Sequence, residues 1–209
     1  MARILISSGP TRQYIDPVRY LTNASSGRMG RALCRAAVEG GHDVVVVSGP
    51  VSIEYPPAVD VIPVVTTEEM LDVCQTAFQN CDGFIGVAAP CDYRPEQVRG
   101  QKIAKTGSPL VLQLVETSDV VATIGADKGA KWVVGFALET VDHHFRAITK
   151  LHRKRCDLIV LNGPQAMDSA ENDIEIIDPH GDVVLKATGD KETVGSKIFD
   201  VIQQRLIGR

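Results

Sequence analysis

The sequence lacks the features that would place it in a membrane, in an export pathway or on nucleic acid. No apolar run approaches the length of a membrane span, and the start, MARILISSGPT, has too short an apolar stretch for a signal peptide. The formal net charge of -4 argues against general nucleic-acid binding. We therefore expect a cytoplasmic protein that binds neither membranes nor nucleic acid.

The cysteines and histidines also lack a disulfide or zinc pattern. The five cysteines are odd in number and show no C-x-x-C spacing, so we expect most of them to be small buried hydrophobic residues. His143, His144 and His152 have no carboxylate, cysteine or third histidine spaced to complete a metal site. We interpret these histidines as surface residues of a helix.

Short apolar strands alternate with amphipathic helices, which is typical of a mostly parallel sheet with helices on both faces. The patterns predict strands at 3–7, 43–48, 59–65, 83–88, 110–115, 132–136 and 157–161, helices at 29–39, 68–79, 119–126, 141–155 and 192–206, and a hairpin of 172–178 with 183–186. A chain of 209 residues with 44% hydrophobic residues can bury a full core. We expect one α/β domain over residues 1–209.

The segment from Ile6 to Gly30, ISSGPTRQYIDPVRYLTNASSGRMG, joins the first strand to the first helix through a long polar loop. Small residues let backbone N–H groups approach an oxyanion, and the following helix points its positive dipole end at the same place. Gly27 and Gly30 are therefore candidate phosphate-loop glycines, although a tight turn and close helix packing explain them about as well. Asn23 and the paired serines, Ser25 and Ser26, favour anion binding.

Two further strand ends carry polar or small residues. Ligands of open α/β sheets bind beyond the carboxyl ends of the strands, so we expect segments 23–30, 88–94 and 135–140 to converge. Ala88 and Ala89 would admit a ligand, and Asp92 could accept a hydrogen bond, face a cation or simply cap its loop. Phe136 could stack on a base or belong to the core.

Two sets of cations are candidates for binding phosphate. Lys102 and Lys105 lie in the irregular segment QKIAKTG, where they would otherwise be solvated loop charges. Arg146, Lys150 and Lys154 are spaced four apart and form a row on the predicted helix, with neighbours roughly 6 Å apart. A triphosphate would neutralise this row, and a solvated helix face is the alternative.

A nicotinamide-dependent reductase is disfavoured by two missing signals. A dinucleotide site needs an acidic residue at the end of the second strand for the ribose, and here that position reads Ser48-Gly49-Pro50. None of the four tyrosines has a lysine four residues later, as short-chain reductases require. Nicotinamide binding would be needed to revive this alternative.

The motifs together resemble one family, phosphopantothenoylcysteine synthetase, which is the second activity of the bacterial bifunctional coenzyme A biosynthesis flavoprotein. The resemblance covers nearly the whole chain. It rests on GPTR-x4-DPVRY-x2-N-x-SSG-x-MG at 9–30, AA-x2-DYRP at 88–95, the lysine strap KIAK at 102–105, and VVGFA-x-ET at 133–140. It implies a modified Rossmann-like α/β fold with a dimerisation hairpin and strap region.

The resemblance implies a ligase that joins 4'-phosphopantothenate to L-cysteine with CTP and releases CMP and pyrophosphate. The carboxylate needs a good leaving group before an amine can displace it, so the family first forms an acyl-cytidylate. Attack on phosphorus brings anions together, so Mg2+ and cations are expected around the phosphates. The flavin-binding decarboxylase half of the bifunctional protein is missing from this sequence, so no flavin is expected.

Residue by residue, the resemblance assigns Lys102 to stabilising the phosphates and Asn23 to holding the acyl-nucleotide. Arg19 resembles an arginine that reaches the pantothenate phosphate across a dimer interface, so a homodimer is expected. The nucleotide positions are Gly86, Val87, Ala88, Asp92, Lys102, Asp119, Val120, Val121, Ala122, Phe136, Lys150 and Lys154. The phosphopantothenate positions are Arg19, Asn23, Ser25, Gly27, Ala88, Ala89 and Asp92. The metal ligands stay open.

The sequence departs from the family pattern at two places. Ala104 replaces the usual third lysine of the strap, and Thr117-Ser118-Asp119 replaces Asn-Pro-Asp, with Ser118 as a good N-cap. A chain with Ala104 could instead be a non-catalytic, nucleotide-binding partner of a separate phosphopantothenoylcysteine decarboxylase. The sequence leaves this alternative, and the choice between CTP and ATP, open.

Overall fold

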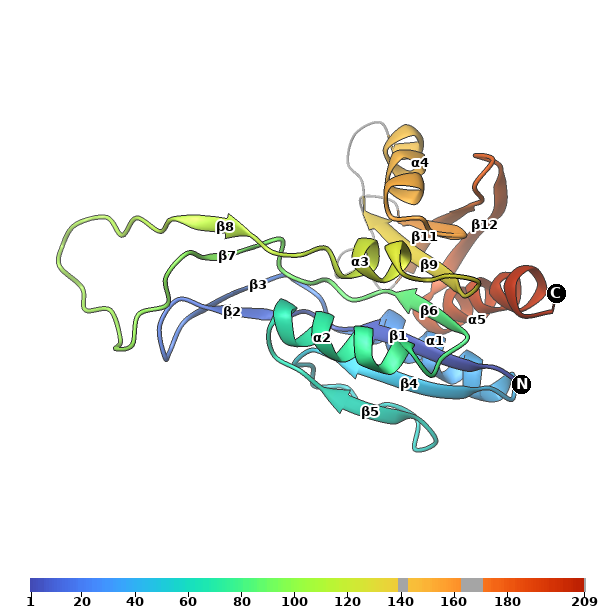
Figure 1. Ribbon diagram of the computed structural model, residues 1–209, viewed down its shortest axis with the longest axis horizontal. Coiled ribbons are helices and arrows are strands. Elements are labelled where there is room, and N and C mark those ends of the chain that lie inside the picture. The colour runs from blue at the N-terminus through green and yellow to red at the C-terminus, as the bar shows by residue number, and fades with distance from the viewer. Residues whose placement is uncertain (139–142, 163–170, 209) are drawn as a thin grey trace.

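The computed structural model describes residues 1–138, 143–162 and 171–208. Figure 1 shows a sheet covered by helices, with a long arm that projects from one end. The strands of the sheet are β1 (Arg3–Ser8), β4 (Asp43–Ser48), β5 (Asp60–Pro63), β6 (Gly83–Gly86), β9 (Trp132–Leu138), β10 (Leu158–Asn162), β11 (Glu171–Ile177) and β12 (Val183–Asp190).

The strand order of the sheet is β12-β11-β10-β9-β6-β1-β4-β5. All neighbours from β5 to β10 are parallel, whereas β11 and β12 form an antiparallel hairpin at one edge. The expected mostly parallel α/β fold is thus confirmed. The chain leaves β1 toward β4 and later returns on its other side with β6, and this reversal of direction creates the crevice where doubly wound folds bind ligands.

Helices cover both faces of the sheet. The helices α1 (Arg28–Glu39) and α5 (Lys191–Ile202) cover one face, and α2 (Thr67–Phe78), α3 (Val120–Ala126) and α4 (His143–Arg153) cover the other (Figure 1). Within β1, Ile4 and Ile6 pack toward α1, while Leu5 packs toward α2. Because both faces are buried, the parallel strands read as continuous apolar runs in the sequence.

The helix ends follow ordinary capping chemistry. Thr66 and Glu69 form a reciprocal capping box at the start of α2, and the Asp190 side chain accepts from the N–H of Thr193 at the start of α5. The helix predicted at 192–206 is α-helical up to Ile202 and continues as a π-helical turn over Gln203–Ile207. Within the described residues, no helix is long and apolar enough to cross a membrane.

The arm is the part of the fold whose strands the hydrophobic patterns mostly missed, although the resemblance implied a hairpin and strap region. Its strands are β2 (Arg12–Tyr14) with β3 (Tyr20–Thr22), and β7 (Tyr93–Pro95) with β8 (Leu114–Glu116). The strand predicted at 110–115 is wrong over 110–113, since pairing covers only 114–116. Leu110 and Val111 are 56% and 86% exposed, so their apolar character does not come from burial within this chain.

Other differences concern boundaries. β5 covers 60–63 instead of 59–65, and β12 runs on to Asp190. The start of the helix predicted at 141–155, and the Glu139-Thr140 part of the VVGFA-x-ET motif, lie outside the described residues. The five cysteines are all buried and unpaired, as expected, and His144 and His152 are exposed.

Candidate functional site

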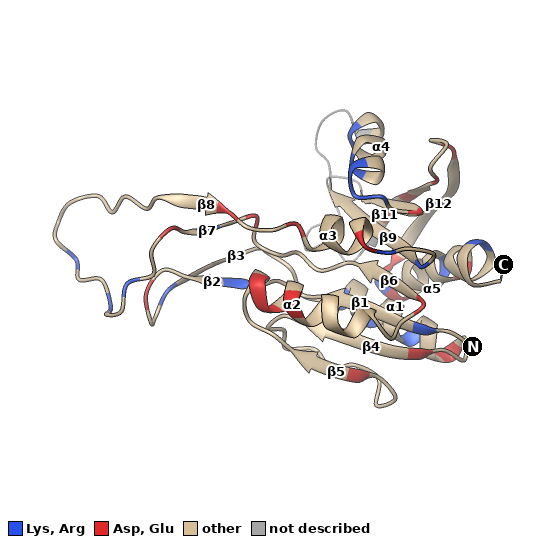
Figure 2. Cartoon of the chain, viewed as in Figure 1, with Lys and Arg blue, Asp and Glu red and all other residues tan. Residues whose placement is uncertain are grey.

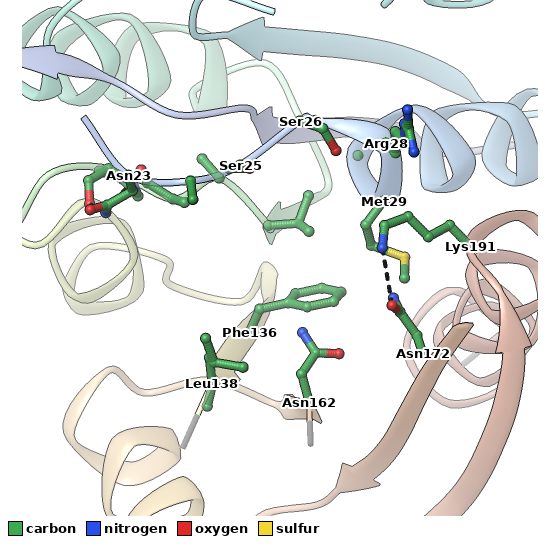
Figure 3. Close-up of a pocket in the computed structure, with 18 of the residues that line it drawn as sticks. Asn23, Ser25, Ser26, Arg28, Met29, Phe136, Leu138, Asn162, Asn172 and Lys191 are labelled. Atoms are coloured by element: carbon green, nitrogen blue, oxygen red, sulfur yellow. Dashed lines mark hydrogen bonds between the residues drawn. The ribbon is translucent and has the colours of Figure 1, made fainter. Parts of the chain in front are cut away.

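A cavity of about 570 Å³ lies where β1, β6, β9 and β10 end. Residues of the 23–30 loop, the 87–92 loop and the end of β9 line it together, so the predicted convergence is confirmed for the residues described. Figure 3 shows their side chains around one space. The lining residues are Asn23 to Gly30, Val87 to Pro90, Asp92, Phe136 to Leu138, Lys150, Asn162, Asn172 and Lys191.

The two glycines of the first loop have different structural reasons. Gly27 is the N-cap of α1 and has a φ of 73°, which glycine adopts without strain. A Cβ on Gly30 would lie 2.0 Å from the Ser8 hydroxyl oxygen, so only glycine lets α1 approach β1 this closely. Backbone conformation therefore accounts for Gly27 and close packing for Gly30, and this packing also brings the positive end of α1 to the cavity wall.

A tyrosine that the sequence did not single out supports this loop from below. The Tyr55 hydroxyl lies 2.8 Å from the hydroxyl of Ser8 and 2.9 Å from that of Ser48. Ser8 in turn donates to the Gly27 carbonyl at 3.4 Å. Burial raises the pKa of Tyr55, more than these hydrogen bonds lower it, so the phenol stays protonated and holds the ends of β1 and β4 beneath the loop.

The 88–92 loop is fixed by threonine hydroxyls. The Thr11 hydroxyl oxygen accepts from the Cys91 N–H at 2.8 Å and lies 2.9 Å from the Thr67 hydroxyl. The Cys91 carbonyl accepts from Thr67 at 3.2 Å and from Thr117 at 2.6 Å. Thr11 has no exposed surface, so these bonds are shielded from water. The GPTR motif thus holds the loop that carries the alanines and Asp92.

Asn23 bridges the two loops of the cavity. Its side-chain amide donates to the carbonyls of Ala89 and Pro90 at 3.3 and 2.8 Å. Asn23 therefore has a defined place in the cavity wall before any ligand binds. Ser25 follows it along the same wall, as Figure 3 shows.

The cationic row of α4 is only partly as predicted. Lys150 lines the cavity, but the ammonium of Lys154 forms an ion pair at 3.0 Å with Asp119, which Arg153 approaches at 3.8 Å. Lys154 therefore needs no triphosphate for its neutralisation, because a carboxylate of the same chain already pairs with it, and its contact with a nucleotide stays a prediction. Burial raises the pKa of the Asp119 carboxyl. The opposing effect of Lys154, the Ala122 N–H and Arg153 is larger, so the net pKa lies below its usual value.

The start of α3 also differs from expectation. Asp119, not Ser118, is the N-cap, and its carboxylate accepts from the Ala122 N–H at 3.0 Å. The Ala122 N–H, at one of the expected nucleotide positions, is therefore already occupied by a side chain of the same chain. Gly86 and Val121 are not among the residues that line the cavity, and they lie in close contact, since a Cβ on Gly86 would be 2.5 Å from a Val121 methyl group. Val120 is buried.

Arg19 and Lys102 lie together on the arm and do not line the cavity of their own chain. The Asp16 carboxylate, which has no exposed surface, accepts from the Ile103 N–H at 3.1 Å and pairs with Arg19 at 3.1 Å. Arg19 also donates to the Ile103 carbonyl at 3.1 Å. These contacts fasten the strap beside Lys102 to the 16–19 turn. Figure 2 shows basic residues at this far end of the arm.

The Asp16 carboxylate is held in its ionised form. Burial raises the pKa of this carboxyl. The pKa is lowered by a larger amount by the Arg19 guanidinium and by hydrogen bonds from the backbone N–H groups of Ile103, Val18 and Arg19. The net pKa therefore lies below its usual value. The geometry of the strap therefore depends on a charged Asp16.

Comparison with known proteins identifies the family. A family model described as the DNA/pantothenate metabolism flavoprotein C-terminal domain matches residues 1–206. The chain belongs to this family. It is 40% identical over 211 residues to the coenzyme A biosynthesis bifunctional protein CoaBC of Vibrio parahaemolyticus, an alignment that covers 97% of this chain and 52% of that protein. The chain thus spans about half the length of this curated relative.

Two solved structures have the same fold. The crystal structure of the C-terminal domain of CoaBC is 34% identical, covers 100% of this chain and 97% of that one, and superposes with a TM-score of 0.86. A Cab2 mutant in complex with phosphopantothenate-cysteine shares the fold at a TM-score of 0.78, with 14% identity over 97% of this chain and 87% of that one.

Three cavity residues of this family member were missed by sequence reasoning. Asn162 ends β10, Asn172 lies on β11, and Lys191 begins α5. The antiparallel hairpin at the sheet edge brings the last two to the cavity. A polar residue directly after the apolar run DLIVL could have drawn attention to Asn162, whereas Asn172 and Lys191 carry no such signal.

The described residues contain no group of three or more His, Cys, Asp or Glu side chains that could hold a metal ion. Asp92 is the acidic residue among those that line the cavity. A metal would therefore need most of its ligands from elsewhere, such as the phosphates of a bound nucleotide.

Proposed function

We propose that this chain is a phosphopantothenate–cysteine ligase that uses CTP, acting in the cytoplasm in coenzyme A biosynthesis. The observation that carries the proposal is the convergence of the Asn23–Gly30 loop, the Ala88–Asp92 loop and Phe136 on one cavity, in a chain of the family described above. These are three of the four segments on which the resemblance to the synthetase rests.

The reaction proceeds in two displacements. The carboxylate of 4'-phosphopantothenate attacks the α-phosphorus of CTP, a P–O bond forms, and the bond to the β-phosphate breaks to release pyrophosphate. The amine of L-cysteine then attacks the acyl carbon, a C–N bond forms, and the C–O bond to CMP breaks. The amine proton passes to solvent, and the products are 4'-phosphopantothenoylcysteine, CMP and pyrophosphate.

The lining residues divide between the two bound substrates. The nucleotide would occupy the side with Phe136 and Lys150, where Lys154 and Asp119 form the ion pair behind it. The phosphopantothenate would lie along Asn23 and Ser25. The positive N-terminal end of α1 is part of the same wall and would attract the negative charge of this substrate. The reacting carboxyl and α-phosphate would then meet between these two sides of the cavity.

Mg2+ would enter with the triphosphate. This ion commonly binds through one or two carboxylates together with substrate phosphates, and Asp92 fits as the carboxylate in the cavity wall. When bound, the ion would neutralise phosphate charge during the first displacement. Asp92 would orient the nucleotide by fixing this charge at the loop.

A second copy of the chain would complete the site with its arm. Lys102 and Arg19 do not line the cavity of their own chain, and both belong to the same end of the arm. The arm also exposes apolar side chains, namely Val18, Tyr20, Tyr93, Val98, Leu110, Val111 and Leu114. Apolar patches of this kind commonly mark protein interfaces. In the homodimer, each arm would bring a lysine and an arginine to the partner's phosphates.

The alternative is a non-catalytic nucleotide-binding partner of a separate decarboxylase. The reason to consider it is Ala104, because alanine at this position leaves the strap with one cation fewer. Pyrophosphate release separates the two functions, measured for the purified protein with Mg2+ and CTP or ATP in turn. The ligase requires release that depends on both 4'-phosphopantothenate and CTP, with the amide product formed when cysteine is added. Nucleotide binding without pyrophosphate release would contradict the ligase and favour the alternative.

A further inference from the structure

One end of the cavity carries three polar residues that are not among the assigned substrate positions, namely Asn162, Asn172 and Lys191. Its apolar walls are Met29 and Phe136, and Phe136 is shared with the nucleotide side. Figure 3 shows these side chains directed toward one another, at the end of the cavity away from Asn23. Phe136 and Asn162 come from neighbouring parallel strands and lie on the face of the sheet that α1 and α5 cover.

The Asn162 side chain offers a hydrogen-bond acceptor to this end of the cavity. Its Oδ1 atom is buried and has no hydrogen-bond partner within the parts of the chain that the structure describes. Buried polar atoms without a partner are uncommon, because the atom has lost its water without gaining a replacement. A ligand with an N–H donor would satisfy this oxygen.

Lys191 provides a positively charged hydrogen-bond donor at the same end of the cavity. Its ammonium donates to the Asn172 Oδ1 at 3.0 Å, and Asn172 is only 3% exposed, so the charge is held at a defined point of the wall. An ammonium in such a position forms charge-assisted hydrogen bonds with anionic groups such as a carboxylate. An acceptor and a cation therefore stand at the same end of one cavity.

We propose that this end, defined by Asn162, Asn172 and Lys191, is the subsite for the α-amino acid substrate, L-cysteine. Lys191 binds its carboxylate, Asn162 accepts from its amine, and the thiol lies against Met29 and Phe136, where sulfur–aromatic contact is favourable. The inference rests on the proposed ligase function. It deepens that function because the assigned residues account for the nucleotide and for phosphopantothenate but not for the amino acid.

Cysteamine provides the test of the carboxylate contact, since it has the amine and thiol of cysteine without the carboxylate. The wild-type protein should use cysteine with a kcat/KM about tenfold to a hundredfold above that for cysteamine, as expected for one charged hydrogen bond. In Lys191→Met this preference should collapse toward unity, while Lys191→Arg keeps part of it. The matched control is Lys197→Met, an exposed position on the same helix, which should behave as wild type.

The second variant addresses the amine. Asn162→Ala should raise the KM for cysteine and for cysteamine alike, about tenfold, because both carry the amine. The control is Asn80→Ala at an exposed position remote from the cavity. An unchanged cysteine-to-cysteamine ratio in Lys191→Met, or a KM effect of Asn162→Ala on CTP instead of on cysteine, would overturn the assignment.

Failure of the subsite and failure of the ligase function give different results. Formation of the acyl-nucleotide and of pyrophosphate from CTP and 4'-phosphopantothenate needs no amino acid. Lys191→Met and Asn162→Ala should therefore form this intermediate at the wild-type rate and then consume it slowly. A wild-type protein that forms no intermediate contradicts the ligase function itself. Variants that form it slowly contradict only the cysteine subsite.

Discussion

Replacing Thr11 by valine tests whether the threonine network holds the cavity wall. Valine keeps the shape of threonine, so no void forms, but two hydrogen bonds disappear and the buried Cys91 N–H loses its acceptor. A neutral hydrogen bond contributes about 0.5–1.5 kcal/mol, and an unsatisfied buried donor costs about 1–3 kcal/mol. We expect Thr11→Val to lower the free energy of unfolding by roughly 2–4 kcal/mol.

Thermal unfolding measures the effect. For a chain of this length each kcal/mol shifts Tm by about 2–4 °C, so Tm should fall by roughly 4–16 °C. The matched control is Thr149→Val, which removes an exposed hydroxyl bonded to the Phe145 carbonyl and should change Tm by no more than about 2 °C. Thr11→Ser retains the hydroxyl and should recover most of the loss. Equal Tm values for Thr11→Val and Thr149→Val would refute the reasoning.

The remaining predictions concern the reaction and its pH dependence. Asn23→Ala should slow amide formation more than activation, so mass spectrometry of quenched reactions should detect accumulated acyl-nucleotide; product formed at the normal rate would contradict this role. Lys102→Gln should fold normally but lose about a hundredfold in turnover, and a near-normal rate of intermediate formation would exclude it from the first step. Mixing these two variants should restore activity, because one site of a mixed dimer combines an intact pocket with an intact arm; verified subunit exchange without recovery would refute the shared site. Ionised Asp16 should stabilise the folded state at pH values above the ordinary carboxyl pKa of about 4. This stabilisation should be lost as the pH falls through the lowered pKa of Asp16 in the folded state. Urea unfolding across this range should therefore show a weaker acid dependence in Asp16→Asn than in the wild type, and identical pH profiles would contradict it.

The central sheet could be predicted from the sequence because its signals are local. The run DVVVVS is buried on both faces, and such runs between helical periods indicate parallel strands. The convergence of the cavity segments followed from the same reading, since parallel strands end at one edge.

Features that depend on partners distant in the chain could not be predicted in this way. The strands β2 and β8 have only three residues each, too few to show an alternating apolar pattern, and the buried central residue of β2 is the polar Gln13. Asp119 neutralises Lys154 across 35 positions of sequence, so the helical spacing of the lysines indicated an open cationic row where the fold supplies a carboxylate. The polar end of the cavity is also distant from the motifs in the sequence, because a hairpin at the far edge of the sheet brings Asn172 and Lys191 there.

The two outer strands of the sheet make poor templates for further strand addition. β5 has only four residues and ends at Pro63, which has no N–H to donate, and it begins with an exposed Asp60. β12 carries an exposed lysine, Lys186, and its register against β11 shifts near Ile177. Edge-to-edge aggregation through the sheet is therefore discouraged at both ends. The protein can therefore expose the apolar side chains of its arm for one specific contact. The edges of its sheet do not provide a second surface for unspecific association.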